Sequence, residues 1–319
     1  MKSRPRSIMK VVTVVGFFVV AIVLMLTCRQ WVFRVVNVIW KPYDKNFYSK
    51  NYQVEGGQIY ILDSEAGERY PVKRFFSEGF EDASSVRDLI GLDRGWTSFT
   101  LQSPGAPGIG DYVKLRKRIL GGESGFVENV VEPSRRRARS GLQCLRTLAV
   151  APTSGMVCSK ASLDTMLLHF TKGDDVWFSA WYYFERAGEF ITLMDLETTF
   201  VRGWPGMRIR VNQGCLDMEL KWPPKRVYRQ SSEDRRLVPI GQWVHIQARL
   251  GLSELDDGII QLWQDGDLLV DQRGKTLPFA EAVYNDLEIG LSAYNGGSDA
   301  VSLYVDDVVI SAEPIGGLK

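Results

Sequence analysis

A band of alternating charge runs through three consecutive segments of the chain, 190–200, 206–213 and 215–222. Polar and apolar residues alternate along each segment, which is typical of a β-strand whose two faces meet different environments. The polar faces collect side chains that can bind a sugar or process it, namely Asp195, Glu197, Arg208, Arg210, Asn212, Asp217, Glu219 and Lys221. A hydrophobic core cannot accept such a band unpaired. We therefore expect it to face solvent.

The turn residues between these segments predict how the strands pair. A tight turn at Gln213-Gly214 sets Arg210 opposite Asp217 and Arg208 opposite Glu219. A register centred near 203 sets the two acids of the first segment beside the same arginines. Opposite charges directly across strands contribute roughly 0.2–1 kcal/mol a pair. Arginines flanked in this way keep little free charge for a substrate, which favours binding over catalysis and leaves enzymatic activity open.

Residues 174–185 form a dense aromatic strand. Trp177, Ser179, Trp181 and Tyr183 share one face, and the residues between them share the other, which we interpret as core. Two interpretations of the first face remain open. In the first interpretation, Trp177 and Trp181 stack on sugar rings. In the second, other parts of the protein cover both faces of the strand.

Positioning these side chains requires a sheet scaffold, and the C-terminal stretch 241–311 predicts one. Its segments 241–250, 258–270 and 303–311 are rich in β-branched and aromatic residues and are bounded by Gly, Asp or Asn. Asp265-Gly266 is a two-residue hairpin signal, because both turn positions tolerate positive φ. We expect one curved antiparallel sandwich.

Three motifs in this stretch resemble the end of a concanavalin A-like jelly roll. They are Gly-x-Trp-x-x-Ile from Gly241, Leu-x-x-Asp-Gly from Leu262 and Tyr-x-Asp-Asp-Val from Tyr304. Laminin-G-type lectin domains and the heparin-lyase-I-like and glucuronan-lyase-like polysaccharide lyases share the pattern, which covers roughly 75–311 here. The resemblance implies an all-β fold, a jelly-roll sandwich of two antiparallel sheets. It implies a carbohydrate-binding module or a polysaccharide lyase, because this fold hosts several activities.

A lyase of this kind neutralises a uronate carboxylate, removes the proton at C5 and protonates the leaving oxygen. By resemblance, the neutralising side chains are Arg208, Arg210 and Asn212, and the proton-transfer candidates are Tyr182, Tyr183, Tyr228 and His169. The two-carboxylate alternative of glycoside hydrolases is disfavoured. The segment from Met194 to Glu197 partly resembles the Glu-x-Asp-x-Glu strand of laminarinase-like hydrolases, but Leu193 stands at the first Glu position.

The resemblance also implies a structural Ca²⁺ ion. In such domains an acidic residue of the first strand meets an Asp of the last strand, and here the candidates are Glu81 with Asp306 or Asp307. In the alternative interpretation Glu81 caps a turn and Asp307 faces solvent.

The four cysteines show no zinc-binding spacing. Cys144 and Cys158 flank a turn signal, so they are predicted to form a disulfide outside the cytoplasm. Cys28 falls at the end of an apolar run, and Cys215 is left as a buried thiol.

The N-terminal segment predicts a membrane anchor. Residues 1–45 carry eight Lys or Arg against one Asp, so the remaining chain carries a net charge of −6 within the total of +1. Residues 11–27 are an unbroken apolar run of about the length that spans a bilayer, and the basic flank places the N-terminus in the cytoplasm. A cleaved signal peptide and a lipoprotein signal at Cys28 are the alternatives.

These patterns together predict five regions, which are a basic tail 1–10, a transmembrane anchor 11–27 with an interfacial extension to 40, a stalk 41–73, a jelly-roll sandwich 74–312 and a tail 313–319. We expect a periplasmic or extracellular domain that binds a polysaccharide. A lyase and an envelope scaffold with a protein partner are the alternatives. Nothing indicates nucleic acid, because no basic face with interleaved aromatic residues occurs.

Overall fold

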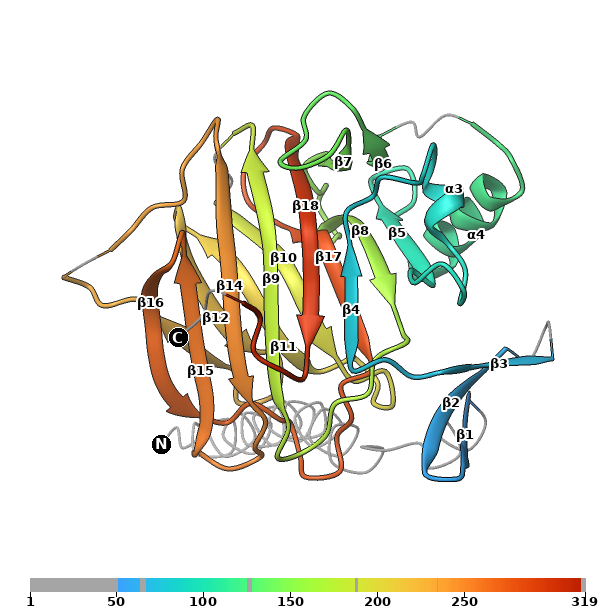
Figure 1. The fold of residues 1–319 in the computed structure, drawn as a ribbon. Coiled ribbons are helices and arrows are strands. Elements are labelled where there is room, and N and C mark those ends of the chain that lie inside the picture. The colour runs from blue at the N-terminus through green and yellow to red at the C-terminus, as the bar shows by residue number, and fades with distance from the viewer. Residues whose placement is uncertain (1–50, 64–66, 125–127, 187–188, 234, 317–319) are drawn as a thin grey trace, which may run out of the picture. The chain divides into compact units, whose positions relative to one another are not determined.

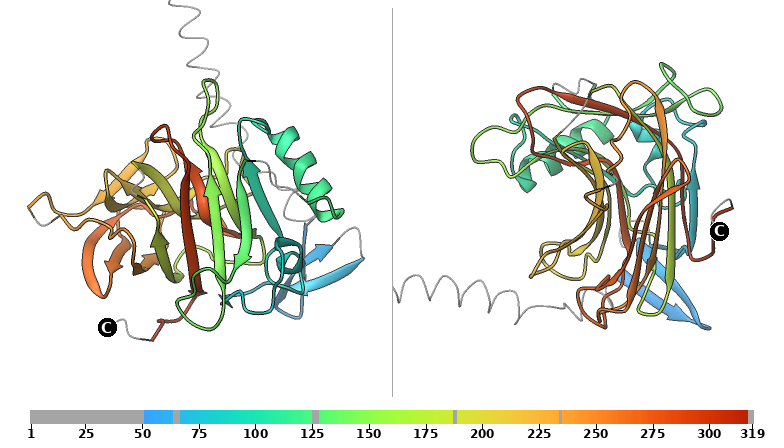
Figure 2. Two further views of the ribbon diagram at one scale, coloured as in Figure 1. Left: turned by 90° about the horizontal axis from the view of Figure 1, so that it is seen from above. Right: turned by 90° about the vertical axis from the view of Figure 1, so that its left-hand side faces the viewer.

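The computed structural model describes residues 51–63, 67–124, 128–186, 189–233 and 235–316. Most of them form two stacked antiparallel sheets (Figures 1 and 2). The predicted all-β sandwich is confirmed. The predicted anchor 11–27 lies outside the described residues, and within them no helix is long and apolar enough to cross a membrane.

The first sheet has seven strands, in the order β5 (Ser98–Gln102), β8 (Ser159–Thr165), β17 (Asp286–Tyr294), β10 (Phe190–Glu197), β11 (Gly206–Asn212), β12 (Cys215–Leu220) and β13 (Arg226–Arg229). The second sheet has eight, in the order β6 (Val130–Ser134), β7 (Cys144–Ala149), β18 (Val301–Ser311), β9 (Asp175–Phe184), β14 (Trp243–Gly251), β15 (Gly258–Gln264) and β16 (Asp267–Gly274), with β4 (Phe75–Glu78) also paired to β18.

Three further features lie outside the sandwich. A three-stranded sheet contains β1 (Tyr52–Glu55), β2 (Gln58–Asp63) and β3 (Glu68–Pro71), within the region 41–73 that the sequence predicts as a stalk. The helices are α3 (Val86–Leu89) and α4 (Ile109–Leu120). Helix α4 packs beside β5 and begins after Gly108, where Asp111 accepts a hydrogen bond from the Gly108 amide.

The two predicted hairpin turns are confirmed. Gln213-Gly214 joins β11 to β12 and Asp265-Gly266 joins β15 to β16, and all four residues have positive φ. This conformation suits the right-handed twist of the strands that the turns connect.

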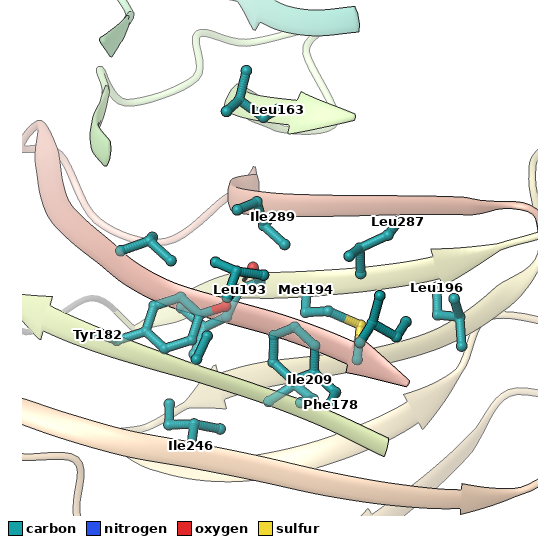
Figure 3. Close-up of a cluster of buried hydrophobic side chains, with 14 of the residues drawn as sticks. Leu163, Phe178, Tyr182, Leu193, Met194, Leu196, Ile209, Ile246, Leu287 and Ile289 are labelled. Atoms are coloured by element: carbon teal, nitrogen blue, oxygen red, sulfur yellow. Dashed lines mark hydrogen bonds between the residues drawn. The ribbon is translucent and has the colours of Figure 1, made fainter. Parts of the chain in front are cut away.

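The core lies between the sheets, because each inner face is an alternate-residue set of apolar side chains. Figure 3 shows its centre, where side chains from the eight-stranded sheet meet those of the seven-stranded sheet. The labelled residues are Leu163, Phe178, Tyr182, Leu193, Met194, Leu196, Ile209, Ile246, Leu287 and Ile289. With this face buried, the intervening residues of each strand must point away from the core.

Candidate functional site

The outward face of the seven-stranded sheet carries the charged band. Strand register aligns one polar residue from each of six strands in a straight line, which we call the transverse row: Ser98, Asp164, Glu288, Asp195, Arg208 and Glu219. The predicted pairings of Arg208 with Glu219 and of Arg210 with Asp217 are confirmed. The prediction that Glu197 lies beside the arginines is wrong, since Glu197 faces Gly206 and its carboxylate accepts from Lys221.

Each arginine of the band is held by two carboxylates. The Arg208 Nε lies 3.0 Å from Asp195 Oδ1, and its Nη1 lies 3.6 Å from Glu219 Oε1. Arg210 forms a fork on Asp217, with distances of 2.7 Å from Nε to Oδ1 and 3.0 Å from Nη2 to Oδ2, and also donates to Glu219. Two-point contacts of this type fix the orientation of a guanidinium group.

The arginines and the carboxylates of the band differ in how far they are exposed to solvent. The side chains of Arg208 and Arg210 are 15% and 18% exposed, whereas those of Asp195 and Glu219 are 2% and 4% exposed. The carboxylates therefore form the floor, and the edges of the guanidinium groups reach solvent above it. This arrangement offers oriented N–H donors to a ligand without a large excess of free positive charge.

Strands β8 and β17 extend this face with charged residues that the sequence analysis missed. Lys160 Nζ lies 3.0 Å from Glu288 Oε2. The Ser292 hydroxyl lies between two carboxylates, 3.0 Å from Glu288 Oε2 and within hydrogen-bond distance of Asp195. Asp164 and Asp286 lie in the same cluster. The spacing Lys160-x-Ser-x-Asp and Asp286-x-Glu was visible as a period-two polar pattern, and it is the signal that could have found them.

Burial and charge act against each other in this cluster. Burial raises the pKa of Asp164 to about 8 and holds the pKa of Asp286 well above its usual range, with the charge of Glu288 adding to both shifts. Burial also opposes ionisation of Asp195, but Arg208, Lys221 and Lys160 outweigh it and lower the pKa of that carboxyl. At neutral pH the cluster therefore combines protonated and ionised acids side by side.

Two adjoining hollows open on this face beside β11 and β12. The smaller, about 110 Å³, is lined by Thr192, Arg208, Arg210 and Glu219, among others. The larger, about 550 Å³, lies next to the Gln213-Gly214 turn. Phe190 and Asn212 line both hollows, so the two adjoin, and we refer to them together as the groove.

The structure corrects the placement of the aromatic candidates. Trp177, Trp181 and Tyr183 are on β9 of the eight-stranded sheet, and they face away from the core on the opposite side of the sandwich from the groove. Arginine side chains cover two of these rings, since Arg139 lies 4.1 Å from the centre of the Trp181 ring and Arg137 lies 4.2 Å from that of Tyr183. Trp177 and Trp181 therefore do not line the groove.

The other proton-transfer candidates also lie outside the groove. Tyr182 is a core residue whose hydroxyl donates to the carbonyl of Leu193, and burial strongly raises its pKa. Tyr228 is buried on the core side of β13. His169 follows β8, near Arg74 and Asp174, and burial lowers its pKa.

The predicted Cys144–Cys158 disulfide is wrong in this structure. Both residues are free thiols, as is Cys215. Cys144 begins β7 in one sheet, whereas Cys158 directly precedes β8 in the other, so the flanking turn signal connects two layers and not two paired strands.

The three calcium candidates converge on the loop 139–143. Glu81 accepts from the amides of Leu142 and Gln143, and Asp306 accepts from those of Arg139 and Ser140. Asp307 accepts from the Ser140 hydroxyl. These partners are hydrogen-bond donors and not metal ligands, and the described residues contain no group of three or more His, Cys, Asp or Glu able to hold a metal ion. Calcium binding here stays a prediction.

A comparison with protein-family models matches residues 130–309 to the family described as "Polysaccharide lyase", and the match spans more than half of the chain. The chain belongs to this family. The matched residues include every strand of the groove except the edge strand β5. The comparison with curated proteins finds no match.

The comparison with solved structures finds similar folds at low sequence identity. The cellulose-induced protein Cip1 is 17% identical, with a TM-score of 0.51 and coverage of 76% of this chain and 99% of its own. An endo-β-1,4-glucuronan lyase from the fungus Trichoderma reesei is 10% identical (TM-score 0.49, 68% and 95% covered). The alginate lyase Aly36B is also 10% identical (TM-score 0.40, 78% and 99% covered). The similarity to Cip1 shows a shared fold, and the family assignment rests on the family model.

Proposed function

We propose that the protein binds a polysaccharide along the groove of the seven-stranded sheet, as a domain anchored outside the cytoplasm by residues 11–27. The observation that carries this proposal is the transverse row. Arg208 of this row and Lys160 beside it present partly buried donors on a floor of fixed carboxylates, next to adjoining hollows. Sugar hydroxyls both donate and accept, so a surface of alternating donors and acceptors is complementary to them.

Charge balance favours binding over turnover. The groove cations Arg208, Arg210, Lys160 and Lys221 are each already paired with a carboxylate. A lyase must place unshared positive charge or donors against a uronate carboxylate while the C5 proton leaves. Pre-paired arginines provide geometry for recognition but limited extra stabilisation of developing charge.

Glycan-array binding by the full-length protein tests the proposal, followed by titration with the best oligosaccharide. Arg208→Lys keeps the charge but removes the planar fork, so we expect affinity to fall about tenfold, the effect of one lost charge-assisted hydrogen bond. Arg249→Lys is the matched control, because Arg249 forms a similar ion pair of 2.9 Å with Asp175 on the opposite sheet. Equal affinities for the two variants would remove the groove from consideration.

The second candidate is a polysaccharide lyase, and the family match is the observation that favours it. In β-elimination a base takes the C5 proton, the C4–O bond breaks as the C4=C5 bond forms, and an acid returns a proton to the leaving oxygen. Lys160, whose pKa the neighbouring carboxylates raise against the effect of burial, stays protonated and is the candidate acid, and Tyr112 is the candidate base. Tyr112 of α4 is half-buried, and burial raises the pKa of its hydroxyl, while the charge of Lys160 acts in the opposite direction.

Absorbance of unsaturated uronate ends separates the two candidates. Incubation with alginate, glucuronan or a glycosaminoglycan should give a rising absorbance if the protein is a lyase, and Tyr112→Phe should abolish the rise. Binding without any rise supports the binding module. No absorbance rise and no glycan binding, together with a protein partner recovered by cross-linking, would indicate an envelope scaffold instead.

A further inference from the structure

The larger hollow of the groove differs in chemistry from the transverse row. We call it the end pocket; its lining includes Phe190, Asn212, Asp217, Arg229, Gln230 and Arg235. It measures about 550 Å³, within the range of about 300–1,000 Å³ typical of small-ligand sites. It lies where β12 and β13 pair and where the β11–β12 turn closes the sheet.

Positive charge is more accessible in the end pocket than in the transverse row. The Arg229 side chain is 66% exposed and reaches only to 4.0 Å from Asp217, whose two carboxylate oxygens are already bonded to Arg210. Arg235 is exposed on the following loop. By contrast, the side chains of Arg208 and Arg210 are less than one-fifth exposed. The end pocket thus holds guanidinium donors that an incoming anion can reach.

Two further features of the end pocket are complementary to a sugar. The Oδ1 atom of Asn212 is buried and has no hydrogen-bond partner among the described residues, while its Nδ2 donates to Asp217 at 3.3 Å. A buried acceptor without a donor is costly, and a sugar hydroxyl would satisfy it. Phe190 is 43% exposed and offers an apolar ring for the C–H face of a pyranose.

The wall that carries Arg235 is held in place. Gln230 donates to the carbonyls of Leu216 and Arg236 at 3.1 and 3.2 Å and accepts from the Arg236 amide at 2.8 Å. Arg236 in turn pairs with Asp265 and Asp267 of the neighbouring hairpin turn. The pocket is therefore pre-shaped, which lowers the entropic cost of binding.

We propose that the end pocket binds one acidic sugar unit, with Arg229 and Arg235 on its carboxylate or sulfate ester, Asn212 on a hydroxyl and Phe190 beneath the ring. The inference deepens the proposed function and rests on it. It assigns a separate subsite, at one end of the groove, to the acidic group of a sugar unit. The transverse row then contacts the hydroxyl groups of the neighbouring units.

Monosaccharide titrations of the full-length protein, followed by NMR, test the proposal directly. The probes are glucuronate, glucose 6-sulfate and glucose, which share a ring and differ in the acidic group. We expect an acidic probe to shift signals of Phe190 and Arg229, and glucose to bind at least about tenfold more weakly. Comparison of glucuronate with glucose 6-sulfate identifies the preferred anion.

The variant pair Arg229→Ala with Arg235→Ala should remove the acidic preference. Arg226→Ala is the matched control, because Arg226 lies on the same strand but its side chain pairs with Asp256 instead of lining the pocket. Equal binding of glucose and the acidic probes, no shift with any probe, or an unchanged preference in the double variant would each overturn the proposal.

The same variants separate this inference from the proposed function. If polysaccharide binding persists but the double variant behaves as wild type, the end pocket fails and the groove stands. If acidic monosaccharides bind in the end pocket but no polysaccharide binds, the proposed function fails and the pocket stands.

Discussion

Arg210 neutralises two carboxylates that are themselves almost fully buried, Asp217 and Glu219. Arg210→Ala leaves Asp217 without its two-point partner and Glu219 with only the longer contact of 3.6 Å to Arg208 and 3.7 Å to Lys225. Removing one partner of a buried ion pair costs about 3–5 kcal/mol. We expect the free energy of unfolding in urea to fall by about that amount. Arg229→Ala, on an exposed side chain, should change it by less than about 0.5 kcal/mol. A loss below about 1 kcal/mol for Arg210→Ala would contradict the two-carboxylate arrangement.

This result has a practical side for binding studies. Alanine at Arg208 or Arg210 would confound loss of a ligand contact with loss of stability, because both arginines are part of the buried network. Charge-conserving changes such as Arg208→Lys are the cleaner probes of recognition.

Asp164 makes stability depend on pH in an unusual direction. Its pKa rises from the ordinary 3.8 to about 8 on folding, because burial disfavours the charge. The folded protein therefore keeps a proton that the unfolded chain loses between about pH 4 and 8. The stability that this proton contributes is fully present below pH 4 and is lost as pH rises through 8. Between these values the free energy of unfolding falls by up to about 1.4 kcal/mol per pH unit.

Asp164→Asn should remove this slope and make the protein more stable than wild type near pH 8. Urea denaturation at several pH values measures it. Asp256→Asn, at a side chain that is 70% exposed, is the control and should leave the slope unchanged. A variant slope equal to that of wild type would show that Asp164 does not carry the proton.

At the scale of strands, the sheet to which each strand belongs determines whether two cysteines can form a disulfide. Cys144 and Cys158 belong to different sheets, so unfolding midpoints should be the same with and without reductant. In the native protein Cys158, which is half-buried, should react with iodoacetamide before Cys144, whose pKa burial raises to about 12. Mass spectrometry of the labelled peptides checks both points, and a linked 144–158 peptide would contradict them.

The strand faces themselves were predictable. Period-two alternation correctly separated Phe178 and Tyr182 from Trp177 and Trp181, and turn chemistry correctly fixed the register of β11 and β12. Which sheet a strand joins is not encoded in its own alternation, because both sheets have one buried face. Alternation therefore predicts the two faces of the aromatic strand correctly and leaves its layer undetermined. The same limit explains the incorrect disulfide.

Residues of the site that come from distant segments were the hardest to foresee. Strand β17 lies between β10 and β8, so Glu288 joins Asp195 although 93 positions separate them in the chain. Such non-local pairing depends on the jelly-roll topology and not on local sequence. The fold class and half of the groove followed from sequence; the Lys160–Glu288 half required the strand order.

At the scale of the molecule, the described domain should fold without the N-terminal segment. Residues 46–319 form a compact unit by themselves. A chain starting at Asn46 should be recovered in the soluble fraction, whereas the full-length chain should sediment with membranes if residues 11–27 are an anchor. Circular dichroism checks the fold of the shorter chain. Recovery of the full-length chain in the soluble fraction would contradict the predicted anchor.

Carboxylates along the transverse row are shared between neighbouring strands, and this limits which substitutions the surface can accept in related proteins. Glu219 contacts both Arg208 and Arg210, and Asp195 joins Arg208 to Ser292 across two strand boundaries. Replacing one of these charged residues leaves a charged side chain on the neighbouring strand without its ion-pair partner. Relatives with altered ligand preference should therefore have exchanged these residues in compensating pairs, and stepwise drift should be confined to the open margin around Arg229.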